Sequence, residues 1–338
     1  MEKLKIGVIG AGRIGKIHAE NIARFIPQAV LEGIADINLT EEQKSWAKSL
    51  GARIISTDPE DLLKDPSIEA VIICSSTGTH ADFTVAAAQA GKHIFCEKPI
   101  DLTVAKVKAA IDAVKKAGVK LQVGFNRRFD HNFARIREHT LAGGIGEVQM
   151  IKISSRDPAP PPPAYVAVSG GIFLDMMIHD FDMARFQAGS EITEVFAAGA
   201  VLVDPEIGKA GDVDTAVVTL KFANGAIGMI DNSRKAVYGY DQRVEVFGSK
   251  GAAVAENDLP NTVKLYNEAG VTGEKPLYFF LERYKNAFID EMSAFIDAVQ
   301  NNKPAPVTGE DGLADMYAAL AAGKSLKEGR RVKIEEVK

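Results

Sequence analysis

Asp175 and His179 are the side chains in this sequence best suited to proton transfer, because they stand four residues apart in the run Gly170–Asp182. If this run is helical from about Leu174, within a helix expected over Phe173–Phe186, the two side chains share one face. Oxidation of an alcohol requires a base that takes the hydroxyl proton while hydride leaves the same carbon, and histidine titrates closest to neutral pH. The spacing therefore indicates a candidate acid–base pair, in which Asp175 orients the imidazole or binds a neighbouring hydroxyl.

The same run admits two other interpretations. His179 also fits a histidine that is satisfied within the core, and a metal ion could be bound jointly by Asp175, His179, Asp180 and Asp182. A helix places Asp180 and Asp182 on other faces, so we predict no metal site. The remaining histidines lack a comparable partner and are expected to be structural or to face solvent: His18, His80, His93, His131 and His139.

Lys98 is a third candidate for the chemistry, since Glu97-Lys98-Pro99 directly follows a strand expected over His93–Cys96. Ligands of a parallel sheet bind at the carboxyl ends of its strands. Pro99 restricts Lys98 to an extended conformation and allows a cis bond between them, which would aim the amine rigidly. The alternative is a lysine that is merely solvated at the end of a strand.

A glycine-rich turn over Gly10–Gly15 follows the apolar strand Leu4–Ile9 and opens a helix. In this context it is the fingerprint of a dinucleotide site: one glycine allows the tight turn, the next lets a pyrophosphate approach the backbone, and the last lets helix and strand pack closely. The free N–H groups of the helix N-terminus suit phosphate. We expect cofactor contacts from Gly10, Gly12, Arg13, Ile14 and Gly15.

Asp36 lies 21 residues after Gly15, at the end of the second expected strand, where its carboxylate would hydrogen-bond the ribose hydroxyls of the adenosine half. A 2′-phosphate would meet this carboxylate as a like charge, so NAD is favoured over NADP, although the nearby Arg13 could partly neutralise such a phosphate. The polar run Cys74–His80 follows the fourth strand and could line the nicotinamide ribose, or Thr79 could simply cap the next helix. Further cofactor contacts are expected from Ser75, Thr77, His80, Glu97 and Lys98.

Short apolar runs alternate with longer amphipathic ones up to Gly124, which is the rhythm of a doubly wound α/β domain. The short runs are rich in Val and Ile on both faces, as a buried parallel sheet requires. Strands are expected at Leu4–Ile9, Val30–Ala35, Arg53–Ser56, Ala70–Cys74, His93–Cys96 and Leu121–Val123, and helices at Ile14–Phe25, Glu41–Leu50, His80–Ala90 and Val104–Ala117. We therefore expect residues 1–124 to form the dinucleotide-binding domain.

After Phe125 the pattern changes to runs that alternate apolar and polar residues, which predicts a largely antiparallel sheet in a second domain, residues 125–338. Asn224-Gly225 and Gly248–Gly251 mark two hairpin turns. Strands are expected at Glu147–Ser155, Asp214–Phe222, Ala226–Asn232, Arg243–Phe247 and Val263–Tyr266, and helices at Asn132–Leu141, Phe173–Phe186, Glu282–Gln300 and Gly312–Leu326. The last two helices are expected to cover this sheet or to reach back to the first domain.

The composition is that of an ordinary globular protein, with 46% hydrophobic and 25% charged residues in a length of 338 that allows about two domains. A formal charge of −5 offers no broad basic surface, so nucleic acid is not an expected partner. Glycines interrupt the apolar N-terminus, and no run approaches the roughly 18 apolar residues of a membrane span. We expect a soluble, cytoplasmic protein without a membrane partner or a disulfide. The stretch Asp157–Pro163 should be a stiff extended connection or, alternatively, a ligand for an SH3-type module.

Three motifs, in this order and at these separations, resemble the Gfo/Idh/MocA oxidoreductases: Gly10–Gly15, Glu97-Lys98-Pro99 and the run from Gly171 through Asp175 to His179. The resemblance covers essentially the whole chain. It is closest to the inositol 2-dehydrogenase branch of that family, through Gly124–Asp130, Ser155–Pro158, Gly171–Met183 and Tyr238–Asp241.

The resemblance implies a Rossmann domain followed by an α+β domain, whose open, mostly antiparallel sheet carries substrate on one side and subunit contacts on another. It implies a homotetramer that uses NAD to oxidise a cyclic polyol, foremost myo-inositol to its 2-keto form, scyllo-inosose, as in myo-inositol catabolism. Another inositol isomer or a pyranose sugar is the alternative substrate. A protein of another class, an NAD-binding regulator without turnover, would not need the acid–base residues Lys98 and His179.

The resemblance also assigns roles by motif position. His179 would be the base and Lys98 would polarise the reacting hydroxyl, with Asp175 completing the catalytic group. Further substrate contacts are implied for Arg128, Asp157, Tyr238 and Tyr284. Such a set of side chains can pair many ring hydroxyls and would reject analogues that lack one.

Overall fold

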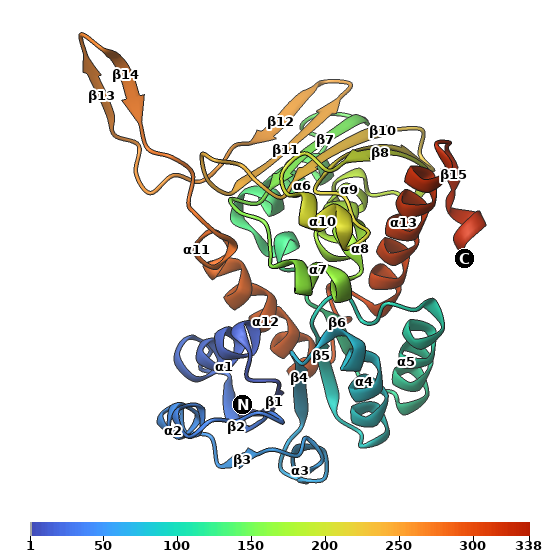
Figure 1. Ribbon diagram of the computed structural model, residues 1–338. Helices are drawn as coiled ribbons and strands as arrows, with labels where there is room; N and C mark the ends of the chain where they lie inside the picture. The colour runs from blue at the N-terminus through green and yellow to red at the C-terminus, as the bar shows by residue number, and fades with distance from the viewer. Residues whose placement is uncertain (1) are drawn as a thin grey trace. The chain divides into compact units, whose positions relative to one another are not determined.

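The chain folds into two compact units, which a computed structural model describes over residues 2–338. Unit 1 comprises the chain up to Phe129 together with Asn286–Leu313. Unit 2 comprises Asp130–Lys285 and Ala314–Lys338. Unit 1 is therefore built from two stretches that are far apart in the sequence, shown in blue-green and in red-orange in Figure 1.

Unit 1 contains a six-stranded, fully parallel sheet in the order β3-β2-β1-β4-β5-β6. Its strands are β1 (Leu4–Ile9), β2 (Ala29–Ala35), β3 (Ile54–Ser56), β4 (Ala70–Ile73), β5 (His93–Cys96) and β6 (Leu121–Val123). Its helices are α1 (Arg13–Phe25), α2 (Glu41–Ser49), α3 (Glu60–Leu63), α4 (His80–Gln89), α5 (Val104–Ala117) and most of α12 (Lys285–Gln300), with short 3₁₀ turns η1 (Thr77–Thr79) and η2 (Asn126–Phe129). This order is that of a doubly wound dinucleotide-binding sheet, which confirms the expected fold class.

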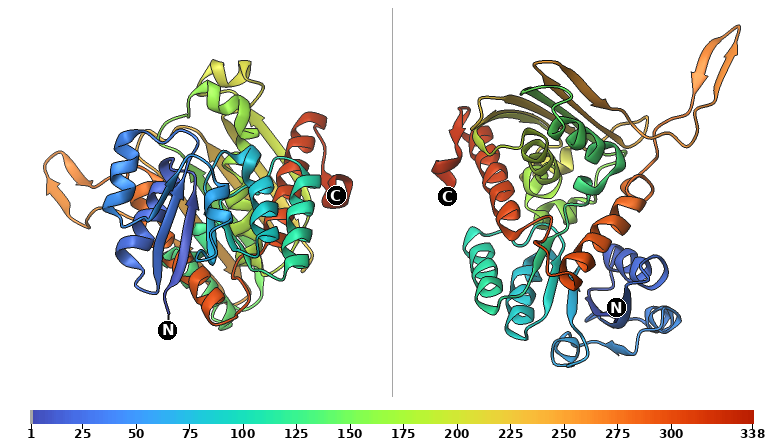
Figure 2. Two further views of the ribbon diagram at one scale, coloured as in Figure 1. Left: turned by 90° about the horizontal axis from the view of Figure 1, so that it is seen from below. Right: turned by 180° about the vertical axis from the view of Figure 1, so that it is seen from behind.

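Both faces of this sheet are covered. On one face, Met292, Phe295 and Ile296 of α12 are at most 1% exposed and share a core with buried residues of β1, β2, α1 and α2. On the other face, Leu62 and Ile68 pack against the glycines of the central strands. The strands are consequently apolar on both sides, as a parallel sheet between helices requires. Figure 2 shows these strands side by side with their helices.

Unit 2 contains a seven-stranded sheet in the order β12-β11-β7-β10-β9-β8-β15. Its strands are β7 (Val148–Arg156), β8 (Ile192–Ala200), β9 (Thr215–Phe222), β10 (Ile227–Ser233), β11 (Asp241–Gly248), β12 (Gly251–Ala255) and β15 (Val332–Lys333). Only the β10–β7 pair is parallel, so the sheet is mostly antiparallel, as expected. The two turns identified in the sequence connect β9 to β10 and β11 to β12.

The helices of unit 2 lie on one face of this sheet (Figure 1), where Ser325 of α13 accepts a hydrogen bond from the N–H of Ala197 in β8. The helices are α6 (His131–Leu141), α7 (Pro163–Ser169), α8 (Gly171–Asp175), α9 (Ile178–Ala188), α10 (Pro205–Lys209), α11 (Phe280–Arg283) and α13 (Gly309–Glu328), followed by η3 (Ile334–Val337). α13 begins in unit 1 and continues in unit 2. No helix among residues 2–338 is long and apolar enough to cross a membrane.

The other face of the seven-stranded sheet exposes large apolar side chains. Strand pairing places them on one surface, since Met150 pairs with both Ile227 and Phe247, and Asp231 pairs with Val217. These four apolar side chains are 42–50% exposed. We call this surface the open face; its exposed apolar residues are Met150, Phe196, Val217, Ile227, Phe247 and Val254.

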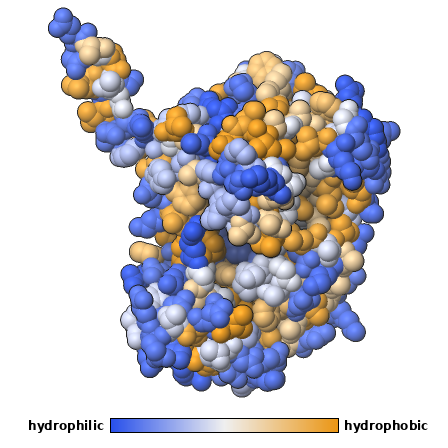
Figure 3. Space-filling view, viewed as in Figure 1, coloured by the Kyte–Doolittle hydropathy of each residue, from blue (hydrophilic) through white to orange (hydrophobic). Residues whose placement is uncertain are grey.

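A separate hairpin, β13 (Lys264–Asn267) with β14 (Gly270–Gly273), stands out from unit 2. All residues of both strands are exposed, and Leu265, Tyr266 and Val271 are apolar or aromatic. Figure 3 shows hydrophobic and hydrophilic side chains mixed along it.

The expected single helix Phe173–Phe186 was wrong. The structure has two helices, α8 and α9, separated by a turn at Met176 and Met177. The N–H of Met177 donates to the carbonyl of Ile172 at 2.8 Å, five residues back, which interrupts the regular pattern. Consequently Asp175 and His179 are not one turn apart on a common helix.

Two other differences concern unit 2. The strand β8 was not predicted, although apolar and polar residues alternate along Ile192–Ala200. The helix expected over Glu282–Gln300 is divided into α11 and α12 at Tyr284. The proline-rich stretch has no regular structure up to Pro162, after which Pro163 begins α7.

Candidate active site

The glycine-rich turn between β1 and α1 is constrained by close backbone contacts. Gly10 has a φ of +101°, and a Cβ atom on it would lie 2.5 Å from the carbonyl oxygen of Cys74. A Cβ atom on Gly15 would overlap the carbonyl oxygen of Gly10. Apart from Gly12 and its neighbours in the chain, no atom of the described residues lies within 4 Å of the position that a Cβ on Gly12 would occupy. Gly10 and Gly15 thus form the turn, while Gly12 leaves its outer side open.

The start of α1 is suited to a dinucleotide. Gly12 is the N-cap residue and supplies no side-chain hydrogen bond, so the first N–H groups of the helix can donate to phosphate. Asp36 follows β2 and accepts hydrogen bonds from the N–H of Ala11 at 2.7 Å and of Asn38 at 2.8 Å. Arg13 and Ile14 occupy the first turn of the helix, and Arg13 is exposed. These residues fit NAD for two reasons: the chain leaves the approach to Gly12 open, and the carboxylate of Asp36 lies beside the turn.

The segment after β4 is tied to the segment after β5 by His80. Its Nε2 lies 2.9 Å from the carbonyl oxygen of Ser75, and its Nδ1 lies 2.9 Å from that of Pro99. Thr77 begins the turn η1, and the hydroxyl of Thr79 donates to the carbonyl of Ser76 rather than capping α4. The imidazole of His80 therefore fixes the two segments relative to each other.

Lys98 follows β5 and is half-buried, and the Lys98–Pro99 peptide bond is cis. The neighbouring Glu97 is only 9% exposed; its Oε1 lies 2.8 Å from Nε2 of His18, and its Oε2 accepts from the N–H of Lys98 at 3.3 Å. A Cβ atom on Gly124 would lie 2.9 Å from Oε2 of Glu97. The carboxyl group of Glu97 is thus packed inside unit 1, against the backbone of Lys98 and Gly124.

His18 is buried, with a carboxylate partner that the sequence did not reveal. A second buried carboxyl, Glu291 of α12, has ligand atoms within 4.8 Å of those of His18 and Glu97. Burial, followed by the charge of Glu97, raises the pKa of Glu291 well above its ordinary value. Because His18, Glu97 and Glu291 are distant in sequence, only the fold brings them together.

Arg128, expected to contact substrate, lies in η2 of unit 1. Its Nη2 is 3.1 Å from Oδ1 of Asp311, a residue of α13 that belongs to the same unit. This ion pair holds the guanidinium beside the second stretch of unit 1.

In unit 2, Asp175 ends α8 and His179 lies in the first turn of α9. Oδ1 of Asp175 accepts from the hydroxyl of Tyr165 at 2.8 Å, and its Oδ2 lies 3.0 Å from Nη2 of Arg234. Arg234 also lies 3.7 Å from Asp157, so one guanidinium is close to two residues whose sequence motifs predict a place at the site. Neither Tyr165 nor Arg234 was predicted.

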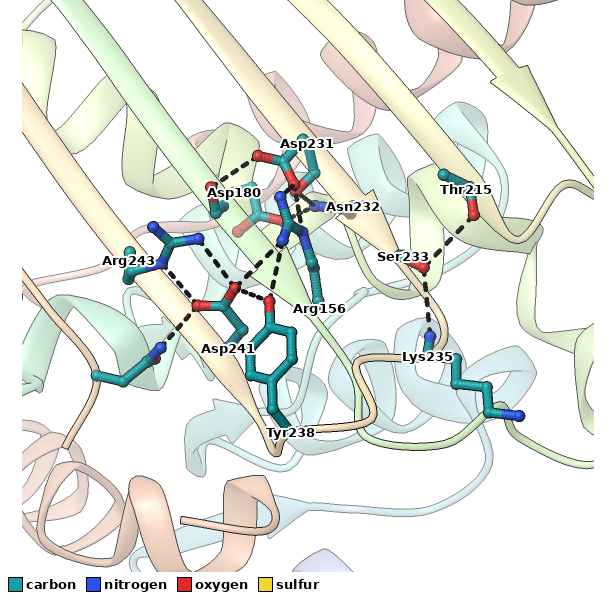
Figure 4. A network of polar contacts seen from close by, with 12 residues as sticks. Arg156, Asp180, Thr215, Asp231, Asn232, Ser233, Lys235, Tyr238, Asp241 and Arg243 are labelled. Atoms are coloured by element: carbon teal, nitrogen blue, oxygen red, sulfur yellow. Dashed lines mark hydrogen bonds and ion pairs between the residues drawn. The ribbon is translucent and has the colours of Figure 1, made fainter. Parts of the chain in front are cut away.

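Asp180 and Asp182 are fully buried, whereas His179 is half-buried. Asp180 accepts from the side-chain amide of Asn232 at 2.9 Å (Figure 4). The carboxylate of Asp180 is therefore used within the core of unit 2.

Tyr238, expected to contact substrate, belongs to a polar network at one end of the open face (Figure 4). Its hydroxyl donates to Asp241 at 2.5 Å and accepts from Nη1 of Arg156 at 3.0 Å. Burial followed by the bond to Asp241 raises the pKa of Tyr238. Burial alone would raise the pKa of Asp241, but hydrogen bonds from Arg243, Tyr238 and Asn257 outweigh it and lower that pKa.

Tyr284 is 2% exposed, packs edge-on against Tyr240, and its hydroxyl lies 3.4 Å from Oε1 of Gln242. The structure thus gathers two groups of candidate residues. In unit 1 the dinucleotide and lysine candidates follow the carboxyl ends of β1, β2, β4 and β5. In unit 2 Asp157 and Asp175 meet at Arg234, while Tyr238 and Tyr284 make other contacts.

Comparison with known proteins agrees with both units. Residues 4–125 match the family model described as an oxidoreductase family with an NAD-binding Rossmann fold, and residues 133–254 match the GFO/IDH/MocA C-terminal domain. The chain is 54% identical over 334 residues to a myo-inositol 2-dehydrogenase of Thermotoga maritima, covering 99% of each chain. It is 46% identical to an inositol 2-dehydrogenase of Rhizobium meliloti, covering 98% of this chain and 99% of the other.

Two solved structures are similarly close. A myo-inositol dehydrogenase from Corynebacterium glutamicum superposes with a TM-score of 0.93 at 40% identity, over 98% of both chains. A scyllo-inositol dehydrogenase from Lactobacillus casei, with bound NAD(H) and scyllo-inositol, has a TM-score of 0.90 at 34% identity, over 99% of this chain and 100% of the other. With its two domain matches and full-length relatives, the chain belongs to the Gfo/Idh/MocA family of NAD-dependent oxidoreductases.

Proposed function

We propose that this protein is an NAD-dependent dehydrogenase that oxidises myo-inositol at one ring hydroxyl to the 2-keto form. The observation that carries the proposal is a dinucleotide turn with an open Gly12 and a flanking Asp36, in a chain 54% identical over its length to a myo-inositol 2-dehydrogenase. When bound, NAD supplies the acceptor for the hydride that leaves the substrate carbon.

The side chains carry out the proton transfer and bind the hydroxyls of the substrate. His179 accepts the hydroxyl proton on a ring nitrogen, and the ammonium of Lys98 polarises the same hydroxyl. Asp175 binds a neighbouring hydroxyl as an acceptor, since its carboxylate is already oriented by Tyr165 and Arg234. Arg128, Asp157, Tyr238 and Tyr284 are proposed to pair further ring hydroxyls, which would select for a fully hydroxylated ring.

The test is to mix protein, NAD and myo-inositol and follow the absorbance of reduced nicotinamide. We expect reduction with myo-inositol at a higher kcat/KM than with scyllo-inositol or glucose. Preference for scyllo-inositol would indicate that the substrate is another inositol isomer, as in the Lactobacillus casei relative. Preference for glucose would indicate a pyranose substrate. NAD binding without turnover of any polyol would instead indicate a regulatory protein.

We also infer that the protein assembles as a homotetramer through the open face. In addition to its exposed apolar residues, this face has a shallow hollow of about 290 Å³ lined by Met150, Phe196, Ile227 and Met229. Exposed apolar patches of this kind mark protein interfaces. A cytoplasmic location is proposed with it, in keeping with the free thiols of Cys74 and Cys96.

A further inference from the structure

A buried arginine, Arg234, lies among the acidic candidate residues of unit 2. It directly follows β10 and is 3% exposed. Its Nη2 atom is 3.0 Å from Oδ2 of Asp175, and its Nη1 atom is 3.7 Å from Oδ2 of Asp157. Since Asp175 ends α8 and Asp157 follows β7, one guanidinium forms ion pairs with two carboxylates from separate segments.

The backbone holds Arg234 beside Asp157. The N–H of Arg234 donates to the carbonyl of Asp214 at 2.8 Å. The N–H of Asp157 donates to the carbonyl of Ser233 at 2.9 Å, and the N–H of Ala236 donates back to the carbonyl of Asp157 at 2.6 Å. These backbone hydrogen bonds therefore fix the main chain of Arg234 relative to both Asp214 and Asp157, independently of its side chain.

Asp175 is held from two directions. Its Oδ1 accepts from the hydroxyl of Tyr165 at 2.8 Å, and its Oδ2 faces Arg234. Because each oxygen has a fixed partner, rotation of the carboxylate is restricted. A carboxylate has about four lone-pair sites, and the contacts with Tyr165 and Arg234 restrict the direction from which a substrate hydroxyl can donate to it.

The cluster contains more acid than one arginine neutralises. Asp212 accepts from the N–H of Ile172 at 2.9 Å. Burial, with a small contribution from Asp175, raises the pKa of Asp212, although backbone hydrogen bonds from Ile172 and Val213 and the charge of Arg234 act to lower it. The Nε and Nη2 atoms of Arg234 are both buried without a hydrogen-bond partner among residues 2–338, so the 3.0 Å approach of Nη2 to Asp175 is an ion pair and not a hydrogen bond. A buried donor without an acceptor lowers stability, so this guanidinium is not optimised for stability.

We propose that Arg234 is a positioning residue for the reaction, which acts through Asp175 and, together with Tyr165, fixes the direction in which that carboxylate accepts a substrate hydroxyl. This inference rests on the proposed function. It also accounts for Asp157, whose carboxylate is held toward the same guanidinium.

A double-mutant cycle tests the proposal. Arg234→Lys keeps the charge but loses the planar fork, and misplacing a reacting group by about 1 Å can lower the rate by about 10²-fold. We therefore expect kcat with myo-inositol to fall by about 10²-fold while the KM for NAD stays unchanged. In an Asp175→Asn background, the same substitution should lower kcat by less than about threefold further, because the group through which it acts is already altered.

Two more variants keep the test decisive. Tyr165 is 48% exposed, so Tyr165→Phe removes one hydroxyl without disturbing the core, and it should show the same non-additivity with Asp175→Asn. Arg185 is the matched control, since it is 8% exposed and pairs with Glu191 and Asp315, which are not candidate site residues. Arg185→Lys should retain a kcat close to that of the wild type.

The outcomes separate the two proposals. Additive losses in the cycle, or an equal loss of kcat in Arg185→Lys, would overturn the positioning role while the wild type still reduced NAD with myo-inositol. If Arg234→Lys does not fold, the cycle of Tyr165→Phe with Asp175→Asn tests the positioning of Asp175 by itself, and additive losses of kcat in it would overturn the proposal. A wild-type protein that turns over no polyol would overturn the proposed function, and the positioning role with it.

Discussion

Proton transfer by a positioned side chain typically accelerates a reaction by about 10²–10⁴-fold. We therefore expect His179→Ala and Lys98→Ala each to lower kcat for myo-inositol oxidation by about that factor, with NAD still bound. Steady-state kinetics and a direct measurement of NAD binding check this. Losses below about tenfold at both positions would remove these two residues from the mechanism.

We expect the charge of Asp36 to determine the choice between NAD and NADP. A carboxylate facing a 2′-phosphate is a like-charge contact worth several kcal/mol, so Asp36→Ser should lower the NAD/NADP ratio of kcat/KM by at least about tenfold. The substitution also removes the acceptor for the N–H of Ala11, which would weaken the use of both cofactors.

Asp36→Asn is the matched variant for that measurement, since its amide oxygen can still accept from Ala11 while the charge is gone. It should shift the ratio as Asp36→Ser does but keep more activity with NAD. An unchanged ratio in both variants would show that the specificity lies elsewhere, with the exposed Arg13 as the next residue to replace.

The candidate residues could be predicted only where local sequence determines position. The glycine turn, Asp36 and Lys98 follow strand ends, so the βα alternation alone locates them. Arg234 had no such signal, because its role depends on Asp157 and Asp175, which only the tertiary structure brings to it. The carboxylate partner of His18 was missed for the same reason.

At the scale of elements, α12 places a carboxyl where water cannot reach it. The pKa of Glu291 is raised from 4.5 by burial and by the charge of Glu97, and both oxygens lack a hydrogen-bond partner among the described residues. When folding raises the pKa of an acid, both states carry the proton below the pKa of the unfolded state, and ionisation costs no stability there. As the pH rises from that pKa toward the pKa of the folded state, the free energy of unfolding falls. Glu291 therefore destabilises the protein progressively above about pH 4.5.

Replacing this acid by its amide should remove the penalty. Up to the raised pKa, wild-type stability should fall relative to Glu291→Gln by up to about 1.4 kcal/mol per pH unit. Denaturant unfolding of both proteins from pH 5 upward checks this. Parallel stability curves for the two proteins would show that Glu291 is not protonated in the folded state.

Element boundaries were predictable where periodicity was strong. β1, β5, β6 and α5 have the expected ends. The expected helix Phe173–Phe186 failed because continuous apolar and acidic residues gave no sign of the turn at Met176 and Met177, which carry no breaker such as proline or glycine. The parallel sheet was easier to recognise than the second sheet, where β8 was overlooked.

At the scale of the whole molecule, the open face should govern assembly. Ile227, the first residue of the central strand β10, is 50% exposed on this face, and a lysine there would have to be desolvated in a subunit interface. We expect Ile227→Lys to convert the proposed tetramer to a smaller species in analytical ultracentrifugation. Leu141→Lys, on α6 and 71% exposed, is the control and should leave the mass unchanged. A tetramer in both variants would move the interface elsewhere.

Because α12 belongs to unit 1, the core of this unit can be completed only late in synthesis of the chain. Residues up to Phe129 leave the ribosome long before Met292, Phe295 and Ile296, which the same core requires. Burying each of these side chains contributes about 1.5–3 kcal/mol, so the nascent domain lacks a substantial part of its stability until most of the chain has emerged. Until then the apolar surfaces of β1 and α1 that pack against α12 lack this partner and are prone to aggregation.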